Sequence, residues 1–195
     1  MTDRRLILSS TSKPRQALLQ RLLVPFELAA PNIDESPLPH ENPEELVLRL
    51  AKEKAFIVAK QFPDSLIIGA DQVGVLNNKI QGKPLTHEKA IQQLQEASGQ
   101  AMHFFIGLCL YDSRSHTEQL ALERFDVVYR HLTPVMIDLY LKKEQPYECA
   151  GSCKAEGLGI ALIEEFKGRD YTALIGLPLI RLIAMLEKAG LDPLR

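Results

Sequence analysis

Short apolar segments alternate with amphipathic segments along this chain, and that alternation constrains its fold more than any other feature. A short apolar run bounded by turn residues predicts a strand, and apolar residues at helical spacing predict a helix that covers it. Strands are predicted at residues 5–9, 26–30, 66–76, 101–112, 117–131 and 160–163, and helices from about Ser12 and at 43–61, 87–97, 134–143 and 177–189. The pattern predicts an α/β or α+β fold. At 195 residues the chain, 1–195, is expected to be a single domain, built as two lobes around a cleft.

The segment 43–61 shows the most informative helical pattern. Asn42 and Glu45 form a capping pair at its start, and apolar residues recur on one face. Lys54 lies on that same apolar face, so its charged end either extends to solvent along a buried stem or reaches into a site. In the first helix, the buried stripe is predicted to be Leu18, Leu19, Leu22 and Leu23.

The charge balance excludes some partners. A formal net charge of −2 gives no overall attraction to a nucleic-acid backbone or an anionic membrane, so any phosphate binding must be local. No apolar run approaches the length of a membrane span, and the first residues lack the apolar stretch of a secretory signal, which predicts a cytoplasmic protein. The three cysteines have no zinc-site spacing and are expected to be plain thiols.

The segment Ser9-Ser10-Thr11-Ser12-Lys13-Pro14-Arg15 is the first candidate site. It connects a predicted strand to a helix N-terminus, where backbone N–H groups, hydroxyls and the helix dipole suit a phosphate. Arg15 adds a bidentate donor. A hydroxyl-rich helix cap explains the same residues equally well, and neither the Walker nor the dinucleotide fingerprint is present.

Two acidic positions are the second candidate. Asp71 lies in the middle of an apolar strand, where a carboxylate loses several kcal/mol of solvation unless it is paired, bound to a metal or facing a cleft. A structural ion pair with a lysine or arginine is the alternative. Glu35, with Asp34, lies in a proline-bounded loop and offers oxygen ligands of the kind that Mg²⁺ or Mn²⁺ prefers, although such a loop pair is more often only solvated.

Two further segments combine charge with backbone-restricting residues. Lys83 stands between Gly82 and Pro84, which presents its charge rigidly, or else it is a surface lysine at a hairpin exit. The segment 149–159 places a lysine and Glu156 among small residues, which lets a flat ligand approach the backbone, or else it is a glycine-rich connection. Together these local cations and acids indicate a metal–polyphosphate site. No serine-hydrolase elbow and no zinc-protease motif is present.

The order of these motifs resembles the Maf-like nucleotide pyrophosphatases over nearly the whole chain. The matching segments are Leu6-Ile7-Leu8-Ser9-Ser10-Thr11-Ser12 with Arg15, Asp34-Glu35-Ser36, Leu50-Ala51-Lys52-Glu53-Lys54-Ala55, Gly69-Ala70-Asp71-Gln72-Val73, Gly82-Lys83-Pro84-Leu85, Ala150-Gly151-Ser152 and Gly176-Leu177-Pro178-Leu179. The resemblance implies a two-lobed α/β fold similar to the inosine triphosphatases, with a mixed sheet, flanking helices and a central cleft. It also implies hydrolysis of a nucleoside triphosphate to the monophosphate and pyrophosphate.

The same resemblance implies roles for individual residues. Asp71 would be the proton acceptor for the attacking water, and Glu35 and Asp71 would hold a divalent cation, Mg²⁺, Mn²⁺ or Co²⁺. The triphosphate would be contacted by Ser10, Arg15, Lys54 and Lys83. The partner is therefore a small nucleotide, and the chain is expected to be a monomer or a homodimer.

Three positions bear on which base is accepted. Gln72 and Glu156 look like those of the YceF branch, whose implied activity is removal of the modified nucleotide 7-methyl-GTP, whereas the branch acting on dTTP and UTP carries Thr and Gln there. Pro14 stands where many relatives carry an aromatic ring, so it offers only an apolar face to the base. The alternatives are the same reaction on dTTP, UTP or GTP, or a nucleotide-binding regulator of cell division.

Overall fold

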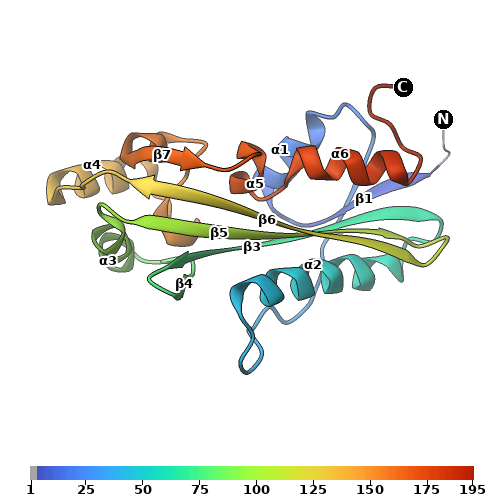
Figure 1. Ribbon diagram of the computed structural model, residues 1–195, viewed down its shortest axis with the longest axis horizontal. Coiled ribbons are helices and arrows are strands. Elements are labelled where there is room, and N and C mark those ends of the chain that lie inside the picture. Colours follow the sequence, from blue (N-terminus) through green and yellow to red (C-terminus); the bar gives the residue numbers. More distant parts are fainter. Residues whose placement is uncertain (1–3) are drawn as a thin grey trace. The chain divides into compact units, whose positions relative to one another are not determined.

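The computed structural model describes residues 4–195, which form a seven-stranded mixed sheet with flanking helices (Figure 1). The strands follow the order β2 (Glu27–Ala29), β1 (Arg5–Ser9), β3 (Ser65–Leu76), β5 (Ala101–Asp112), β6 (Thr117–Tyr129) and β7 (Ile163–Lys167). Strand β4 (Lys79–Gln81) pairs with β3 outside this path. Strand β1 is parallel to both β2 and β3, whereas β4 is antiparallel to β3 and β7 is antiparallel to β6. The predicted α/β class with a mixed sheet and flanking helices is confirmed.

The chain forms two compact units. The first unit comprises the described residues up to 72, residues 106–123 and residues 170–195; the second comprises residues 73–105 and 124–169. The first contains β1 (Arg5–Ser9), α1 (Lys13–Gln20), β2 (Glu27–Ala29), α2 (Pro43–Ala59), α5 (Tyr171–Ile175) and α6 (Leu179–Lys188). The second contains β4 (Lys79–Gln81), α3 (His87–Ala97), α4 (Pro134–Glu144), the 3₁₀ helices η1 (Ala150–Ser152) and η2 (Leu158–Leu162), and β7 (Ile163–Lys167). Strands β3 (Ser65–Leu76), β5 (Ala101–Asp112) and β6 (Thr117–Tyr129) contribute residues to both units.

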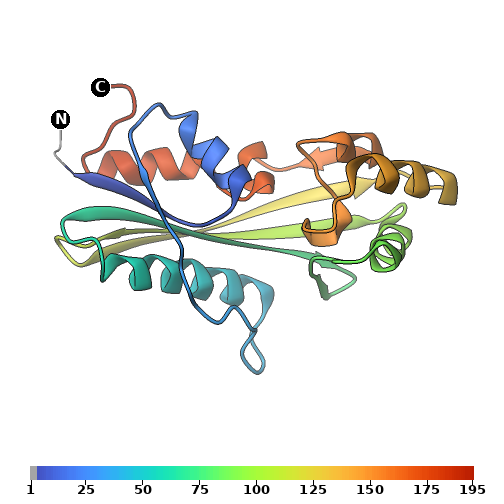
Figure 2. The same cartoon turned by 180° about the vertical axis from the view of Figure 1, so that it is seen from behind.

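Strand periodicity gives the first unit two apolar layers. Successive side chains of a strand point to opposite faces, so Leu6 and Leu8 join one cluster with α1 and α6, while Ile7 joins another with α2. Both views of the ribbon show α1 and α6 on one side of β1 and α2 on the other (Figures 1 and 2). The predicted capping box of Asn42 and Glu45 is present at the start of α2.

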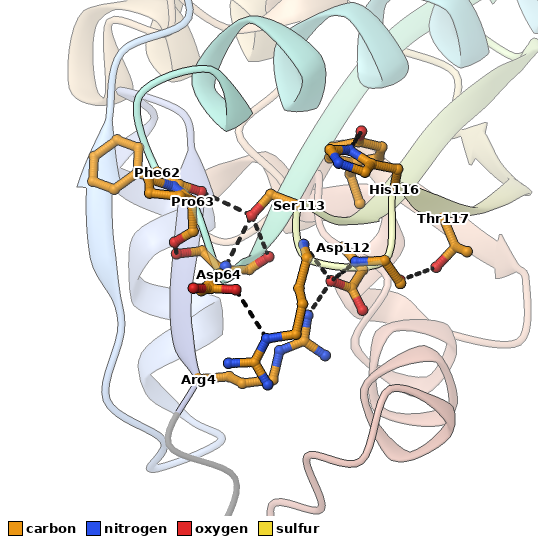
Figure 3. A network of polar contacts seen from close by, with 12 residues as sticks. Arg4, Phe62, Pro63, Asp64, Asp112, Ser113, His116 and Thr117 are labelled. Atoms are coloured by element: carbon orange, nitrogen blue, oxygen red, sulfur yellow. Dashed lines mark hydrogen bonds and ion pairs between the residues drawn. The ribbon is translucent and has the colours of Figure 1, made fainter.

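A polar network joins loops at one end of this unit (Figure 3). The Ser113 hydroxyl donates to the Phe62 carbonyl at 2.8 Å and accepts from the Ser65 backbone N–H at 2.9 Å. Arg4 forms an ion pair with Asp112 in the same network. These contacts satisfy backbone groups of the loop before β3 and tie it to the turn after β5, which fixes the start of β3 and the end of β5.

In the second unit, the end of β3 turns back into β4. Asn77 and Asn78 take positive φ angles of 50° and 60°, which short polar residues tolerate in a two-residue hairpin turn. Helix α3 follows Thr86, whose side chain accepts from the Lys89 backbone N–H. Helix α4 begins after Thr133 in the same manner.

Three details of the predicted secondary structure are wrong. Residues 160–163 were expected to form a strand, but residues 158–162 form a 3₁₀ helix and the strand follows at Ile163–Lys167. The backbone N–H groups of Gly157 and Gly159 both bind the Lys154 carbonyl, which tightens this segment into turns. The actual strand is an edge strand with two glutamates, so its sequence lacks the apolar run that was used to locate it.

The other two errors concern the end of α1 and the presence of α5. Helix α1 ends at Gln20, and Leu23 adopts a φ of 56° with its side chain 91% exposed, so only Leu18 and Leu19 of the predicted stripe are buried and Leu22 is half-buried. Helix α5 was not predicted, because five residues are too few to show helical periodicity.

Two further expectations concern the cysteines and membranes. Cys109, Cys149 and Cys153 are free thiols, and burial raises the pKa of Cys109 to about 12, so that this thiol is a neutral core group. Among residues 4–195, no helix has both the length and the apolar character needed to cross a bilayer.

Candidate active site

A buried lysine joins two carboxylates in the first unit. Lys54 Nζ on α2 lies 2.6 Å from Asp71 Oδ1 on β3 and 2.8 Å from Glu35 Oε1 in the loop after β2. The side chains of Lys54 and Asp71 are only 5% and 10% exposed, whereas that of Glu35 is 58% exposed. The ion pair that sequence reasoning kept as the alternative for Asp71 is therefore present. Its partner is the lysine that the helical pattern placed on the apolar face.

Close backbone packing brings these two side chains together. A Cβ at Gly69 would lie 2.0 Å from the Ala51 carbonyl oxygen, and one at Gly107 would lie 2.1 Å from that of Val47. Only glycine lets α2 approach β3 and β5 this closely. Gly69 lies two residues before Asp71 and therefore on the same face of the strand, the face that α2 covers. Sequence reasoning did not assign this role to Gly69, although a glycine inside an apolar strand is a signal of close backbone approach.

A hydrogen bond from β1 supports the same helix. The Ser9 hydroxyl donates to the Lys54 backbone carbonyl at 2.7 Å, and Ser9 is fully buried. This bond satisfies a buried polar group and ties the first candidate segment to the helix that carries Lys54.

The surroundings of Asp71 set its titration. Burial raises the pKa of the Asp71 carboxyl above its usual range, and the nearby charges of Lys54 and Arg15 partly oppose that rise. Glu35, as a second acid, raises it further. A carboxylate whose pKa lies nearer to neutral pH is a better proton acceptor than an ordinary surface aspartate.

The hydroxyl-rich turn before α1 forms a helix cap, with Ser10 buried and Thr11 exposed. Ser12 is the N-cap residue and accepts from the Arg15 backbone N–H, while the Ser10 hydroxyl accepts from the Ser12 N–H at 3.1 Å. The helix cap that was the alternative explanation for this segment is therefore present. It does not exclude phosphate contacts by the same residues. Pro14 lies in the first turn of the helix and is exposed.

Arg15 and Gln72 meet at the turn that follows α5. Arg15 Nε donates to the Gly176 carbonyl at 2.9 Å, and Gln72 Nε2 donates to the Leu174 carbonyl at 2.8 Å. Gly176 has a φ of 110°, and a Cβ there would lie 3.1 Å from Arg15 Nε and 3.2 Å from Gln72 Oε1. Three of the matched motifs, far apart in sequence, are therefore adjacent in this unit. The Arg15 Nη groups have no acceptor among residues 4–195 and are available to a ligand.

A buried aspartate that sequence reasoning missed shapes the same turn. Asp170, 7% exposed, accepts from the backbone N–H groups of Thr172 and Ile180 at 2.8 and 2.9 Å. The Thr172 hydroxyl in turn accepts from the Leu179 N–H at 2.9 Å. One side chain pair thus caps both α5 and α6. The signal in the sequence is Asp170 itself, because aspartate is a preferred N-cap residue.

In the second unit, Lys83 is a solvent-facing charge. Its Nζ lies 3.2 Å from Glu148 Oε2, but both side chains are more than half exposed, so the pair is weak and easily replaced. The Gln93 side chain, on α3, connects the backbone around Lys83 to another matched motif. Its Nε2 donates to the Gly82 carbonyl at 3.0 Å, and its Oε1 accepts from the Ser152 hydroxyl. Sequence reasoning gave no role to Gln93.

The segment that contains Glu156 lies in this unit as well. Glu156 is exposed and its carboxylate has no ion-pair partner among residues 4–195. Lys154, two residues earlier, binds Glu144 of α4 at 2.7 Å. It stays a prediction that Lys83 and Glu156 meet Arg15, Lys54 and Asp71 at one nucleotide.

The donor set near Asp71 fits a hard divalent cation. Asp71 and Glu35 already share one cationic group, the Lys54 ammonium, and carboxylate oxygens are the ligands that Mg²⁺ and Mn²⁺ prefer. No group of three or more His, Cys, Asp or Glu side chains suited to a metal occurs in the described part of the chain. Two carboxylates match the binding of Mg²⁺ in nucleotide enzymes, where water and phosphate oxygens supply the other ligands.

Comparison with known proteins identifies the family. A family model described as "Maf-like protein" matches residues 5–189. The chain belongs to the Maf-like family. This Maf-like chain is 55% identical over 185 residues to a protein of Nitrosococcus oceani (strain ATCC 19707 / BCRC 17464 / JCM 30415 / NCIMB 11848 / C-107) named 7-methyl-GTP pyrophosphatase. The match covers 95% of this chain and 93% of that protein.

A weaker likeness is found among solved structures. The Maf-like chain superposes on the Staphylococcus aureus Ham1 protein with a TM-score of 0.47 and 13% identity, over 66% of this chain and 73% of that one.

Proposed function

We propose that this chain is a nucleoside triphosphate pyrophosphatase that hydrolyses 7-methyl-GTP to 7-methyl-GMP and pyrophosphate. The observation that carries the chemistry is the buried Asp71 carboxylate, 2.6 Å from Lys54 Nζ and with a raised pKa. A proton acceptor held next to fixed cations is what hydrolysis of a phosphoanhydride needs. The 55% identity over 95% of this chain to a relative named 7-methyl-GTP pyrophosphatase supports the choice of substrate.

In this proposal, the attacking nucleophile is water. The Asp71 carboxylate takes a proton from the water as the water oxygen bonds to the α-phosphorus. The bond between that phosphorus and the oxygen bridging to the β-phosphorus breaks, and pyrophosphate leaves with the bond electrons. The positive charge of Lys54 favours the ionised form of Asp71, which partly opposes the rise in its pKa. The 2.6 Å hydrogen bond from Lys54 Nζ also holds the orientation of the carboxylate.

The triphosphate is bound by cations and hydroxyls. Arg15 offers its Nη groups, Lys54 the remaining N–H of its ammonium, and Ser10 its hydroxyl. Lys83 contributes a point charge, in place of its weak pair with Glu148.

Glu35 and Asp71 would hold the divalent cation, Mg²⁺, Mn²⁺ or Co²⁺. When bound, the cation neutralises phosphate charge and polarises the reacting phosphoryl oxygen. Lys54 Nζ, which both carboxylates bind in the structure, would then transfer part of its interaction to the phosphates.

Recognition of the base is assigned to Glu156, with contributions from Gln72 and Pro14. A guanine edge presents two neighbouring N–H donors, which one carboxylate accepts together, and methylation at N7 adds a positive charge that a carboxylate favours. Glu156 is exposed and has no ion-pair partner among residues 4–195, so its charge is available. Gln72 acts beside Arg15, and Pro14 presents an apolar face.

The remaining elements of the proposal concern context. The chain works in the cytoplasm, as a monomer or a homodimer, on a small nucleotide rather than on nucleic acid or a membrane. A formal net charge of −2 supports a small nucleotide over nucleic acid or a membrane, because it provides no general attraction for polyanions.

The test is a panel of nucleoside triphosphates assayed for pyrophosphate release with Mg²⁺, Mn²⁺ or Co²⁺. The proposal expects the highest kcat/KM for 7-methyl-GTP, with GTP, dTTP and UTP far below. Asp71→Asn should lose turnover while still binding nucleotide. A higher kcat/KM for dTTP, UTP or GTP would mean that this nucleotide, and not 7-methyl-GTP, is the preferred substrate. Nucleotide binding by the parent chain without any pyrophosphate release would favour a nucleotide-binding regulator of cell division.

A further inference from the structure

Two side chains of α4 hold the segment that contains Glu156. Tyr140 and Glu144 are four residues apart and therefore lie on one face of the helix. The Tyr140 hydroxyl donates to the Ser152 carbonyl at 3.2 Å and accepts from the Lys154 backbone N–H at 3.0 Å. These two bonds fix the backbone on the N-terminal side of Glu156.

Glu144 fixes the other side of the same segment. One of its oxygens accepts from the Leu158 backbone N–H at 2.6 Å, and the other binds Lys154 Nζ at 2.7 Å. A Cβ at Gly157 would lie 2.7 Å from the Glu144 carboxylate, so the backbone beside Glu156 passes directly over it. Residues 154–158 are therefore bound at both ends by one helix.

The ion pair between Glu144 and Lys154 also leaves the Glu156 carboxylate of this segment without an ion-pair contact among residues 4–195. The Glu144 side chain is 13% exposed, and its bonds to Lys154 and Leu158 keep its pKa below the usual range, so it stays ionised. In turn, Glu144 raises the pKa of Lys154. Lys154 and Glu144 form a hydrogen-bonded ion pair, whereas Glu156 has no ion-pair contact among residues 4–195 and attracts Lys154 only at longer range.

We infer that Glu144 is a positioning residue for base selection: by binding Lys154 it keeps that ammonium from neutralising Glu156 and leaves one free carboxylate for a cationic purine. This inference rests on the proposed function and deepens it. An unbound Lys154 two residues from Glu156 would do two things. It would compete with the base for the Glu156 carboxylate, and it would repel the positive charge that N7 methylation gives to guanine.

The test compares 7-methylated and unmethylated guanine nucleotides across charge variants. Glu144→Gln keeps the side-chain shape and an oxygen for the Leu158 N–H, but releases Lys154. The ratio of kcat/KM for 7-methyl-GTP over GTP is expected to fall about fivefold, the scale of one solvent-facing charge interaction. In Glu144→Gln/Lys154→Gln the interfering cation is gone, so the ratio should return to near that of the parent chain.

A matched control lies on the same helix. Asp138 and Lys142 form another pair four residues apart on α4, and Asp138→Asn breaks it without touching residues 154–158. This control should leave the ratio unchanged. If Glu144 matters only for folding of the segment, the double variant stays as low as Glu144→Gln. That result, or an unchanged ratio in Glu144→Gln, overturns the inference.

Two measurements keep this test separate from the test of the proposed activity. The affinities for 7-methyl-GMP and GMP are measured by calorimetry, which needs no turnover. An absence of pyrophosphate release in the parent chain would then refute the proposed activity, while the affinity ratio still decides the role of Glu144. No preference for 7-methyl-GMP in the parent chain would overturn the inference. Lys154→Gln alone should keep or increase the preference, even if Glu144→Gln fails to fold, and a decrease would count against Glu144.

Discussion

Replacing Gly69 by alanine should separate α2 from β3 and thereby dismantle the Lys54–Asp71 pair. The added Cβ would lie 2.0 Å from the Ala51 carbonyl oxygen and 2.9 Å from the Ala55 nitrogen, whereas ordinary contact begins at 3.4 Å. Both neighbours are backbone atoms of a helix, so no side-chain rotation relieves the overlap. The helix must move away from the strand by more than 1 Å.

The overlap at Gly69 gives the expected size of the loss of stability and of the loss of activity in Gly69→Ala. Overpacking of a core costs about 1–3 kcal/mol, and the upper end applies here because backbone meets backbone. For a chain of this length, about 3 kcal/mol lowers Tm by roughly 6–12 °C. A displacement of about 1 Å at a catalytic group reduces activity on the order of a hundredfold, so kcat/KM should fall by that factor at a temperature where the variant is folded.

The assay is thermal unfolding followed by circular dichroism, together with initial rates of pyrophosphate release. Gly82→Ala is the control for stability, because a Cβ at Gly82 would have no atom within 4 Å. It should leave Tm unchanged or slightly higher. If Gly69→Ala kept both the Tm and the rate of the parent chain, close packing of α2 on β3 would not be what positions Lys54.

The remaining predictions concern titration, loop support and the metal. Burial raises the pKa of Asp71 and Lys54 lowers it, and the base acts when ionised, so activity should be lost as pH falls through this raised pKa. In Lys54→Met the acid limb of the kcat/KM profile should therefore move to higher pH, and a limb that stays in place or moves down would contradict Asp71 as the base. Gln93→Leu removes the two hydrogen bonds that join the Gly82 carbonyl to the Ser152 hydroxyl, which should destabilise the chain by about 2 kcal/mol in urea unfolding, whereas no loss would mean that these bonds carry no net stability. Chelation of divalent cations should stop pyrophosphate release, and added Mg²⁺ or Mn²⁺ should restore it; full activity in chelator would refute the metal requirement.

The central parts of the site could be predicted because each left a local signal. Lys54 interrupts an apolar helical stripe, and Asp71 interrupts an apolar strand. Each pattern indicates that a charged side chain is buried, and both side chains are buried in the structure. Neither pattern indicates that Lys54 and Asp71 form a pair. Their pairing depends on how closely α2 packs on β3 and β5, which Gly69 and Gly107 allow.

Other parts of the molecule gave misleading or weak signals. The strand β7 carries Glu164 and Glu165, and an edge strand exposed to solvent needs no apolar run. The preceding apolar residues form a 3₁₀ helix because two glycine N–H groups bind one carbonyl, a geometry that composition does not encode. The support of residues 154–158 by Tyr140 and Glu144 is a contact with a neighbouring helix, and such contacts leave no periodic pattern.

The ³¹P NMR spectrum of 7-methyl-GTP incubated with the chain and Mg²⁺, alongside the Asp71→Asn variant, tests both the bond that is cleaved and the role of Asp71. We expect resonances of 7-methyl-GMP and pyrophosphate in equal amounts from the parent chain, and unreacted triphosphate with Asp71→Asn. Orthophosphate with 7-methyl-GDP as the product would contradict cleavage between the α- and β-phosphates. Undiminished turnover by Asp71→Asn would contradict the role of Asp71.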